Sequence, residues 1–253
     1  LKDKWVFLLA CVLLIQPLPL YYVIRACLDP SFITPAIPTR SFWDATFAVQ
    51  SHGSFLETVR VNLWEGQIAS LAWAWDHGRV FQTAALFLLG MLIGRRGLFQ
   101  KENLKVWNKI LAGALIAFFP LYGLGNMLPA FIVNKSILTP LSLIITSLSN
   151  FSFMLVLVSG VIFAFYNTNM HYLLMKITPY GKMSLTNYIT QSIVGSMLYY
   201  NWGFALHNQC GITVSCLAGI AFFILQFTFC RWWMSHHSHG PMEYIWKRAT
   251  WLK

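Results

Sequence analysis

The sequence predicts an all-α, polytopic integral membrane protein with about six transmembrane helices, an outer amphipathic helix and a C-terminal interfacial helix. Three observations indicate this fold class: 57% of the 253 residues are hydrophobic, only 10% are charged, and 16% are aromatic. A soluble domain carries about 25% charged residues, and disordered chains are poor in aromatic ones. The composition therefore argues against a soluble globule and against a disordered segment.

Six stretches are apolar enough to enter the hydrocarbon core, which needs about 20 mostly apolar residues per helix. The second is short, but residues 68–75 before it are also apolar, and residues 76–79 interrupt the run. We therefore expect this helix to start outside the lipid. The third contains Pro120 and Pro129, which predicts a kinked or interrupted helix. The six stretches are residues 5–24, 80–93, 110–132, 141–166, 185–206 and 212–234.

The distribution of Lys and Arg predicts the orientation. With the N-terminus in the cytoplasm, thirteen of the 18 Lys and Arg residues fall on the inner side and five on the outer side. Both termini of the chain are then cytoplasmic. Anionic lipid head groups at the inner surface account for the net charge of +10, so no nucleic-acid partner is required. Cys27 and Cys210 both fall on the outer side, which leaves a disulfide between them open.

The outer segment, residues 25–79, is too long to be a bare loop in a compact protein. Ser54 and Glu57 have the spacing of a capping box, which predicts a helix beginning at residue 55. One interpretation is an amphipathic helix lying on the outer leaflet. The alternative is a lid over an outward-facing site, with polar contributions from His52, Arg60, Asp76, His77 and Arg79.

The polar residues deep inside the predicted spans are uncharged. No Asp, Glu, Lys, Arg or His lies deep in any of the six, which argues against an ion-driven transporter built from these helices alone. At the start of the fifth span, Asn187 and Gln191 are four residues apart and share a helix face. They either hydrogen-bond to neighbouring helices or line a polar pocket near the cytoplasmic leaflet, with Tyr188 at its rim.

The C-terminal tail predicts a short helix. Three His residues lie within residues 236–239, but no thiolate or carboxylate has the spacing of a known metal site, so we expect a solvated cluster and no metal. Pro241 suits the first helical turn, Glu243 favours the positive end, and Lys247 and Arg248 favour the other end. We expect this helix to lie along the inner membrane surface.

Three stretches together resemble the YeiB-like bacterial membrane proteins, the family known as domain of unknown function 418. They are residues 79–95 (RVFQTAALFLLGMLIGR), 181–192 (GKMSLTNYITQS) and 240–248 (GPMEYIWKR), and residues 54–62 are similar to the family's outer helix. The resemblance extends over essentially the whole chain, and it implies a bacterial inner membrane as the location.

Family members usually carry further N-terminal helices with an Asp-x-Leu-Arg-Gly-type motif and a His. The resemblance therefore implies that residues 1–253 are one transmembrane helical domain from the C-terminal part of a longer protein. The long outer segment at residues 25–79 and the cytoplasmic tail at residues 235–253 belong to this domain.

The family pattern singles out residues in two of the motifs: Asn187, Tyr188 and Gln191 in residues 181–192, and Gly240, Pro241, Glu243, Trp246 and Arg248 in residues 240–248. In addition, Lys247 and Arg248 would form a cationic edge with Lys182, and this edge would bind a phosphate or carboxylate through charge-assisted hydrogen bonds. Neither a catalytic residue nor a cofactor is assigned. The candidate substrate-binding residues are Lys182, Asn187, Tyr188, Gln191, Glu243, Trp246 and Arg248.

The family is similar in helix organisation to membrane acyltransferases. This implies an acyltransferase-like protein that transfers an acyl group to a lipid or cell-envelope acceptor. A transporter or exporter of a small amphiphile and a non-catalytic scaffold or sensor are the alternatives. The expected partners are membrane lipids, together with an acyl donor or a small amphiphilic substrate. The GxSxG, P-loop and HExxH motifs are absent from the sequence.

Overall fold

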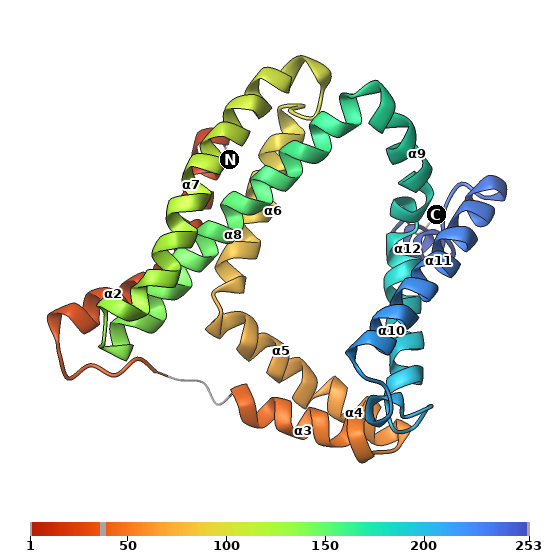
Figure 1. Ribbon diagram of the computed structural model, residues 1–253, viewed down its shortest axis with the longest axis horizontal. Coiled ribbons are helices and arrows are strands. Elements are labelled where there is room, and N and C mark those ends of the chain that lie inside the picture. The colour runs from red at the N-terminus through yellow and green to blue at the C-terminus, as the bar shows by residue number, and fades with distance from the viewer. Residues whose placement is uncertain (1, 36–38, 252–253) are drawn as a thin grey trace. The chain divides into compact units, whose positions relative to one another are not determined.

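The computed structural model describes residues 2–35 and 39–251. Every regular element in these ranges is a helix, with twelve α-helices and two short 3₁₀ helices (Figure 1). By their internal contacts the residues divide into two compact units, Leu1–Thr39 with Ile68–Asn167, and Arg40–Gln67 with Thr168–Lys253. They are called unit 1 and unit 2 below. The expectation of a single domain stays a prediction.

Unit 1 is built from three packed helix pairs. The helices α7 and α8 lie side by side (Figure 1), α1 packs against α6, and α2 packs against α8. At one end, Asp3 of α1 forms ion pairs with Arg95 and Arg96 at the end of α6. The helices are α1 (Asp3–Leu14), α2 (Pro17–Leu28), the larger part of α5 (Glu65–Asp76), α6 (Arg79–Arg95), η1 (Lys101–Asn103), α7 (Leu104–Phe131) and α8 (Lys135–Tyr166).

Several helices have the length and apolar composition of membrane spans. In the described part of the chain these are Lys101–Phe131, Lys135–Tyr166 and Ile212–His236, and two bent pairs, α1 with α2 and α5 with α6, bring the number to five if each pair is one span. The predicted span at residues 185–206 is a helix of only 16 residues, Ser184–Tyr199. These helices are those of a membrane protein, whereas the count of six spans stays a prediction.

The first apolar stretch, residues 5–24, is not one continuous helix. It breaks between α1 and α2, which are bent by 50°. Pro17 has no amide hydrogen and starts α2, and the residue before a proline is disfavoured in a helical conformation. Gln16 adopts a left-handed conformation with φ 61° and is fully buried. Its side-chain nitrogen donates to Ser147 Oγ of α8 at 2.9 Å.

Residues 76–79 interrupt the helix as well as the apolar run, because α5 ends at Asp76 and α6 begins at Arg79 with a bend of 77°. The expected start of this helix outside the lipid stays a prediction. Gly78 has φ 63°. A Cβ at this position would lie 2.4 Å from Gln16 Oε1 and 2.7 Å from Leu143 Cδ2. Only glycine fits, and the two helix breaks of unit 1 therefore lie directly against each other.

The third apolar stretch forms part of α7, which runs unbroken through Pro120 and Pro129. The interrupted form that the prolines suggested is therefore wrong. Each proline removes one backbone hydrogen bond, and packing along α8 holds the helix together across these positions. The close approach of the two helices is seen at Gly125, where an added Cβ would lie 3.5 Å from Ile145.

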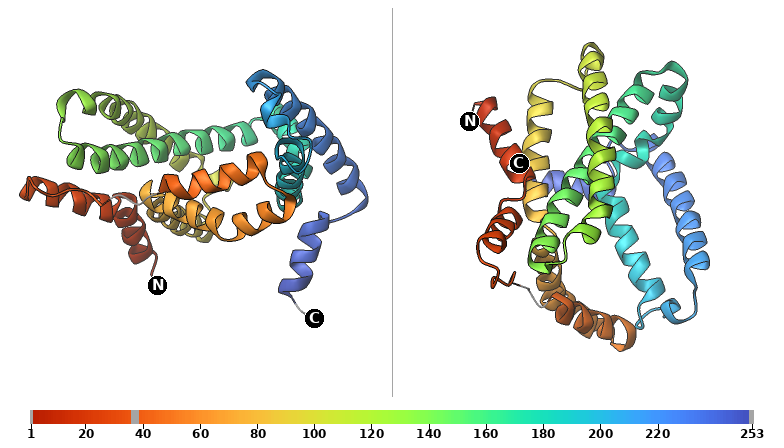
Figure 2. Two further views of the ribbon diagram at one scale, coloured as in Figure 1. Left: turned by 90° about the horizontal axis from the view of Figure 1, so that it is seen from below. Right: turned by 60° about the vertical axis from the view of Figure 1, so that its left-hand side comes forward.

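Unit 2 contains the rest of the outer segment and the C-terminal third of the chain. The predicted capping box is confirmed at the start of α4: Ser54 N donates to Glu57 Oε2 at 2.8 Å, and Glu57 N donates to Ser54 Oγ at 3.4 Å. The chain leaves α11 through a short turn and enters α12 (Figure 2), which begins at Pro241 as predicted. The helices are α3 (Thr39–His52), α4 (Phe55–Leu63), α9 (Thr168–Lys182), α10 (Ser184–Tyr199), η2 (Leu206–Asn208), α11 (Ile212–His236) and α12 (Pro241–Thr250).

Two helices were not predicted. The segment α3 precedes the capping box, and α9 occupies a stretch that was expected to be a cytoplasmic connection. Polar and charged residues are interspersed along both, which hides them from a search for long apolar runs. Nevertheless, α9 packs against α11 and α10.

Candidate functional site

Asn187 and Gln191 of α10 belong to a hydrogen-bond network between three helices of unit 2. Asn187 is 4% exposed; its side-chain nitrogen donates to the Tyr180 carbonyl at 3.0 Å, and its Oδ1 accepts from Cys230 Sγ at 3.2 Å. Gln191 Nε2 donates to Tyr180 OH and to Gln226 Oε1, both at 2.9 Å. This arrangement is the interhelical one of the two alternatives that the sequence left open.

Glu243 joins α12 to the beginning of α10. Its carboxylate accepts from Thr186 N at 3.0 Å and from Thr186 Oγ1 at 2.5 Å, and the same hydroxyl accepts from Met242 N at 3.1 Å. The carboxylate thus lies at the positive N-terminal ends of two helices. Partial burial raises the pKa of Glu243, but the hydrogen bonds from Thr186 outweigh this and lower the pKa below its ordinary value.

The other four candidate residues lie on the surface. Lys182 and Arg248 are exposed, as are Tyr188 at 70% and Trp246 at 68%. Within the described residues, neither the Lys182 side chain nor the Arg248 side chain forms a hydrogen bond or an ion pair. Lys247 Nζ lies 3.2 Å from His239 Nε2. The proposed role of the cationic edge in binding an anion stays a prediction.

The histidine cluster is organised by aromatic contacts. The His237 ring stacks on Trp233 with centroids 4.0 Å apart, and Trp233 Nε1 donates to the His239 carbonyl at 3.0 Å. No group of three or more potential ligands among His, Cys, Asp and Glu could hold a metal ion in the part of the chain that the structure describes.

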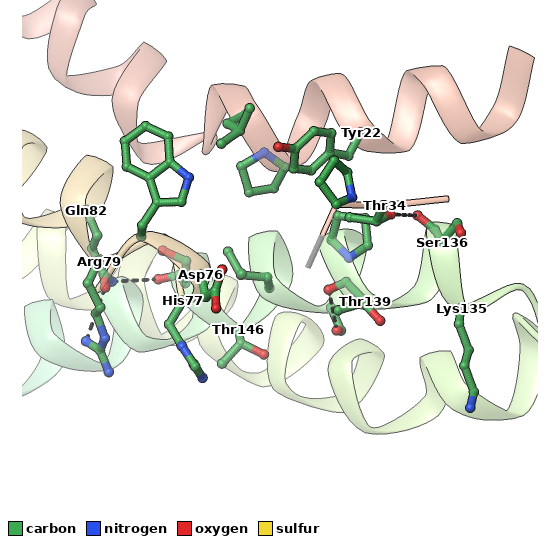
Figure 3. Close-up of a pocket in the computed structure, with 18 of the residues that line it drawn as sticks. Tyr22, Thr34, Asp76, His77, Arg79, Gln82, Lys135, Ser136, Thr139 and Thr146 are labelled. Atoms are coloured by element: carbon green, nitrogen blue, oxygen red, sulfur yellow. Dashed lines mark hydrogen bonds between the residues drawn. The ribbon is translucent and has the colours of Figure 1, made fainter. Parts of the chain in front are cut away.

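A pocket with a volume of about 710 Å³ lies within unit 1, at the bend between α5 and α6 (Figure 3). Volumes of about 300–1,000 Å³ are typical of small-molecule sites. One wall is apolar and comes mainly from α2 and the residues after it, including Leu18, Pro19, Tyr22 and Ile33. The opposite side carries hydroxyl groups from the first turns of α8. The pocket therefore has an apolar and a polar face.

Charged groups lie at both ends of this pocket. Figure 3 shows Arg79 beside Gln82 at one end and Lys135 at the other. Arg79 Nη1 donates to Gln82 Oε1 at 3.3 Å, and the guanidinium carbon lies 5.8 Å from the centroid of the Trp73 ring. Asp76 accepts a hydrogen bond from the Thr39 hydroxyl.

Three of the five residues assigned to an outward-facing site line this pocket together, namely Asp76, His77 and Arg79. The other two, His52 and Arg60, belong to unit 2 and do not line it. The His77 Nδ1 atom lies 3.0 Å from the Trp73 carbonyl oxygen. Because a carbonyl oxygen can only accept a hydrogen bond, Nδ1 carries the hydrogen in this bond, and Nε2 takes no part in it.

Sequence reasoning missed the partners on other helices. The most important of these partners is Gln226, which is 5% exposed and whose side-chain nitrogen donates to the Asn187 carbonyl at 3.3 Å. An amide inside a long apolar run is a readable signal of an interhelical contact. The contributions of Thr186 and Ser147 carry no such signal, because Ser and Thr are common in membrane helices.

The fold and these sites define a helical membrane protein. Residues 93–253, well over half of the chain, match the family described as "Protein of unknown function (DUF418)". The chain belongs to this family, and the predicted YeiB-like membership is confirmed.

Curated relatives of the same kind are found in several bacteria. The chain is 30% identical over 95 residues to the "Uncharacterized protein YxaH" of Bacillus subtilis (strain 168), covering 38% of this chain and 24% of that protein. It is 29% identical over 83 residues to the "Uncharacterized protein YeiB" of Escherichia coli (strain K12), covering 31% of this chain and 20% of that protein. A 39.9 kDa protein of Bacillus acidopullulyticus is 32% identical over 78 residues, covering 31% of this chain and 22% of that protein. These matches therefore span about a quarter or less of the relatives' length. No solved structure matches the chain.

Proposed function

We propose that the chain forms the amphiphile-binding part of a bacterial inner-membrane, acyltransferase-like protein, and that the whole protein transfers an acyl group to a lipid or cell-envelope acceptor. The observation that carries this proposal is the pocket of unit 1, in which a hydroxyl-rich and charged side faces an apolar wall. A molecule with a polar head and an alkyl chain needs both faces. The likeness to membrane acyltransferases supplies the reaction class, and no catalytic residue is assigned.

The proposal includes six spans with both termini of the chain in the cytoplasm. The excess of Lys and Arg in the inner connections supports this orientation. In this topology the bend between α5 and α6 and the beginning of α8 face outward, where an envelope acceptor would enter. The exposed side chains of Lys182, Tyr188, Trp246 and Arg248 would face the cytoplasm, where they could contact an anionic acyl donor.

The transfer reaction is tested with the intact protein that contains this chain, expressed in cells that lack their own copy. Mass spectrometry of lipid and envelope fractions should reveal a product heavier by one acyl group. Thr146→Trp, which fills the pocket, should abolish the product. Thr228→Trp, on the exposed surface of α11, is the matched control and should retain it. If no acylated product in these fractions depends on expression of the protein, the transferase assignment is contradicted.

The two broken helices favour a second candidate, an exporter of a small amphiphile. Gln16 and Gly78 both have left-handed backbone conformations, and the breaks they form lie against each other beside the pocket. Transporters use discontinuous helices of this kind around their substrate sites. Movement of a fluorescent amphiphile across proteoliposome membranes, without acylated product, would support export. Zero flux for a broad panel of amphiphiles would count against it.

A further inference from the structure

We propose that the end of the unit 1 pocket at which Arg79 lies binds the anionic head group of an amphiphile, a phosphate or carboxylate, with Arg79 as its principal ligand. This inference rests on the proposed function, because it names the chemistry of the molecule in that pocket.

Arg79 is held in place while most of its hydrogen-bonding capacity stays free. One nitrogen donates to Gln82 Oε1 at 3.3 Å, and the guanidinium lies over the Trp73 ring at 5.8 Å. Among the described residues no carboxylate forms an ion pair with it, and Asp76 nearby accepts from the Thr39 hydroxyl instead. A guanidinium has several further N–H donors in a planar fork that matches phosphate and carboxylate oxygens.

The group that orients Arg79 is buried. Gln82 is 7% exposed, and its side-chain nitrogen donates to the Ser147 carbonyl at 3.2 Å, which turns its oxygen towards Arg79. The hydroxyl of the same serine accepts from Gln16 at 2.9 Å. These hydrogen bonds run from Gln16 through Ser147 and Gln82 to Arg79, and they connect both helix breaks to the guanidinium. Arg79 itself is exposed, and its contacts with Gln82 and Trp73 restrict the orientations of its side chain before a ligand binds, which reduces the entropy lost on binding.

The backbone adds positive potential at the same end. Helix α6 begins at Arg79, and its N-cap residue, Gly78, has no side chain that could satisfy the first amides. The N-terminal end of a helix favours anions. Lys135, the first residue of α8, lines the opposite end of the pocket. Two cations against the single acid Asp76 leave the lining with a net positive charge when His77 is neutral.

The rest of the pocket argues for an amphiphile rather than a small soluble anion. Leu18, Pro19, Ile33 and Leu143 line it and offer no hydrogen bonds from their side chains, and Trp75 extends this apolar surface. An alkyl chain gains about 0.8 kcal/mol per methylene that it buries against such a wall. A free phosphate would leave this surface uncovered.

The test measures binding to the intact, purified protein in a neutral detergent. The probes are dioleoylphosphatidylglycerol, which has a phosphate head, and dioleoylglycerol, which has the same chains and no anion. Arg79→Gln should weaken phosphatidylglycerol binding about tenfold, the loss of one strong charge-assisted contact. It should leave dioleoylglycerol binding unchanged. Arg79→Lys, which keeps the charge, should recover part of the loss.

Arg25→Gln is the matched control, because Arg25 is also a cation of unit 1, lies over Phe32 and does not line the pocket. It should bind both lipids as the wild type does. An Arg79→Gln variant that retains phosphatidylglycerol affinity, or loses both lipids equally, overturns the inference. Displacement of the lipid by millimolar inorganic phosphate alone would reassign the site to free phosphate and overturn the amphiphile part.

A pocket-filling variant separates this inference from the proposed function. Thr146→Trp should abolish binding of both lipids, whatever the role of Arg79. If it does so while Arg79→Gln has no effect, the pocket still binds amphiphiles and only the anion inference fails. If Thr146→Trp binds both lipids normally, the pocket is not the site, and the proposed function fails with it.

Discussion

Glu243 offers the most direct test of how α12 is attached to the rest of unit 2. Its carboxylate accepts two hydrogen bonds from Thr186, at 3.0 Å from the amide and 2.5 Å from the hydroxyl. Hydrogen bonds to a charged group contribute about 1.5–3 kcal/mol each in a dry site. The carboxylate is partly accessible to water, which replaces much of that energy. We therefore expect Glu243→Gln to cost about 1–2 kcal/mol.

Hydrogen exchange of the α12 amides in the intact protein measures this cost, because local opening of one element does not require global unfolding. Glu243→Gln should speed exchange about tenfold in α12, which corresponds to about 1.4 kcal/mol. A double-mutant cycle with Thr186→Val should show a coupling energy of about 1 kcal/mol. Additive effects of the two substitutions would refute the direct interaction.

The same contact predicts a pH dependence with a defined sign. The pKa of Glu243 is lowered in the folded protein from its ordinary value of 4.5. The stabilisation is therefore fully present above pH 4.5 and is lost as the pH falls through the lower, folded pKa. Corrected for intrinsic exchange rates, protection of α12 should be constant from pH 7 to about pH 5 and fall below that. Equal acid sensitivity in Glu243→Gln would contradict this explanation.

Two further substitutions test the helix break and the hydrogen-bond network through thermal unfolding in detergent. Gly78→Ala should destabilise the protein by about 2 kcal/mol or more, because a Cβ would strain the positive φ and meet Gln16 Oε1 at 2.4 Å. Gly90→Ala, with no atom within 4 Å of its Cβ, should be neutral or stabilising, and equal behaviour of the two would exclude the close approach. Asn187→Leu should cost about 1–3 kcal/mol, since it leaves buried partners unpaired, whereas Tyr188→Leu on the surface should change stability by less than about 0.5 kcal/mol. A neutral Asn187→Leu would show that the network is dispensable.

The elements that the sequence predicted well depend on local rules. Ser54 and Glu57 form their capping box within one turn, and Pro241 begins a helix. Each of these features depends on residues a few positions apart. The break at Gln16 could also have been predicted from Pro17, because the residue before a proline is disfavoured in a helical conformation, but the apolar character of the surrounding stretch concealed it.

The sites depend on contacts between distant residues, which spacing along the chain does not determine. The shared face of Asn187 and Gln191 was predictable, whereas Gln226, 35 residues after Gln191, is brought there by the packing of α11. The pocket of unit 1 combines α2, the bend at residues 76–79 and the start of α8. The sequence suggested three of its polar residues, but only the fold supplies the apolar wall that turns them into a pocket.

Photo-crosslinking tests the central claim, that the pocket of unit 1 holds an amphiphile. A phosphatidylglycerol analogue with a diazirine in its acyl chain is added to the intact protein, and the labelled peptides are identified by mass spectrometry. We predict a label at Leu18 to Tyr22 and around Leu143 that unlabelled phosphatidylglycerol displaces and Thr146→Trp removes. Labelling that is spread over the exposed faces of α7 and α11, and that neither treatment reduces, would contradict the claim.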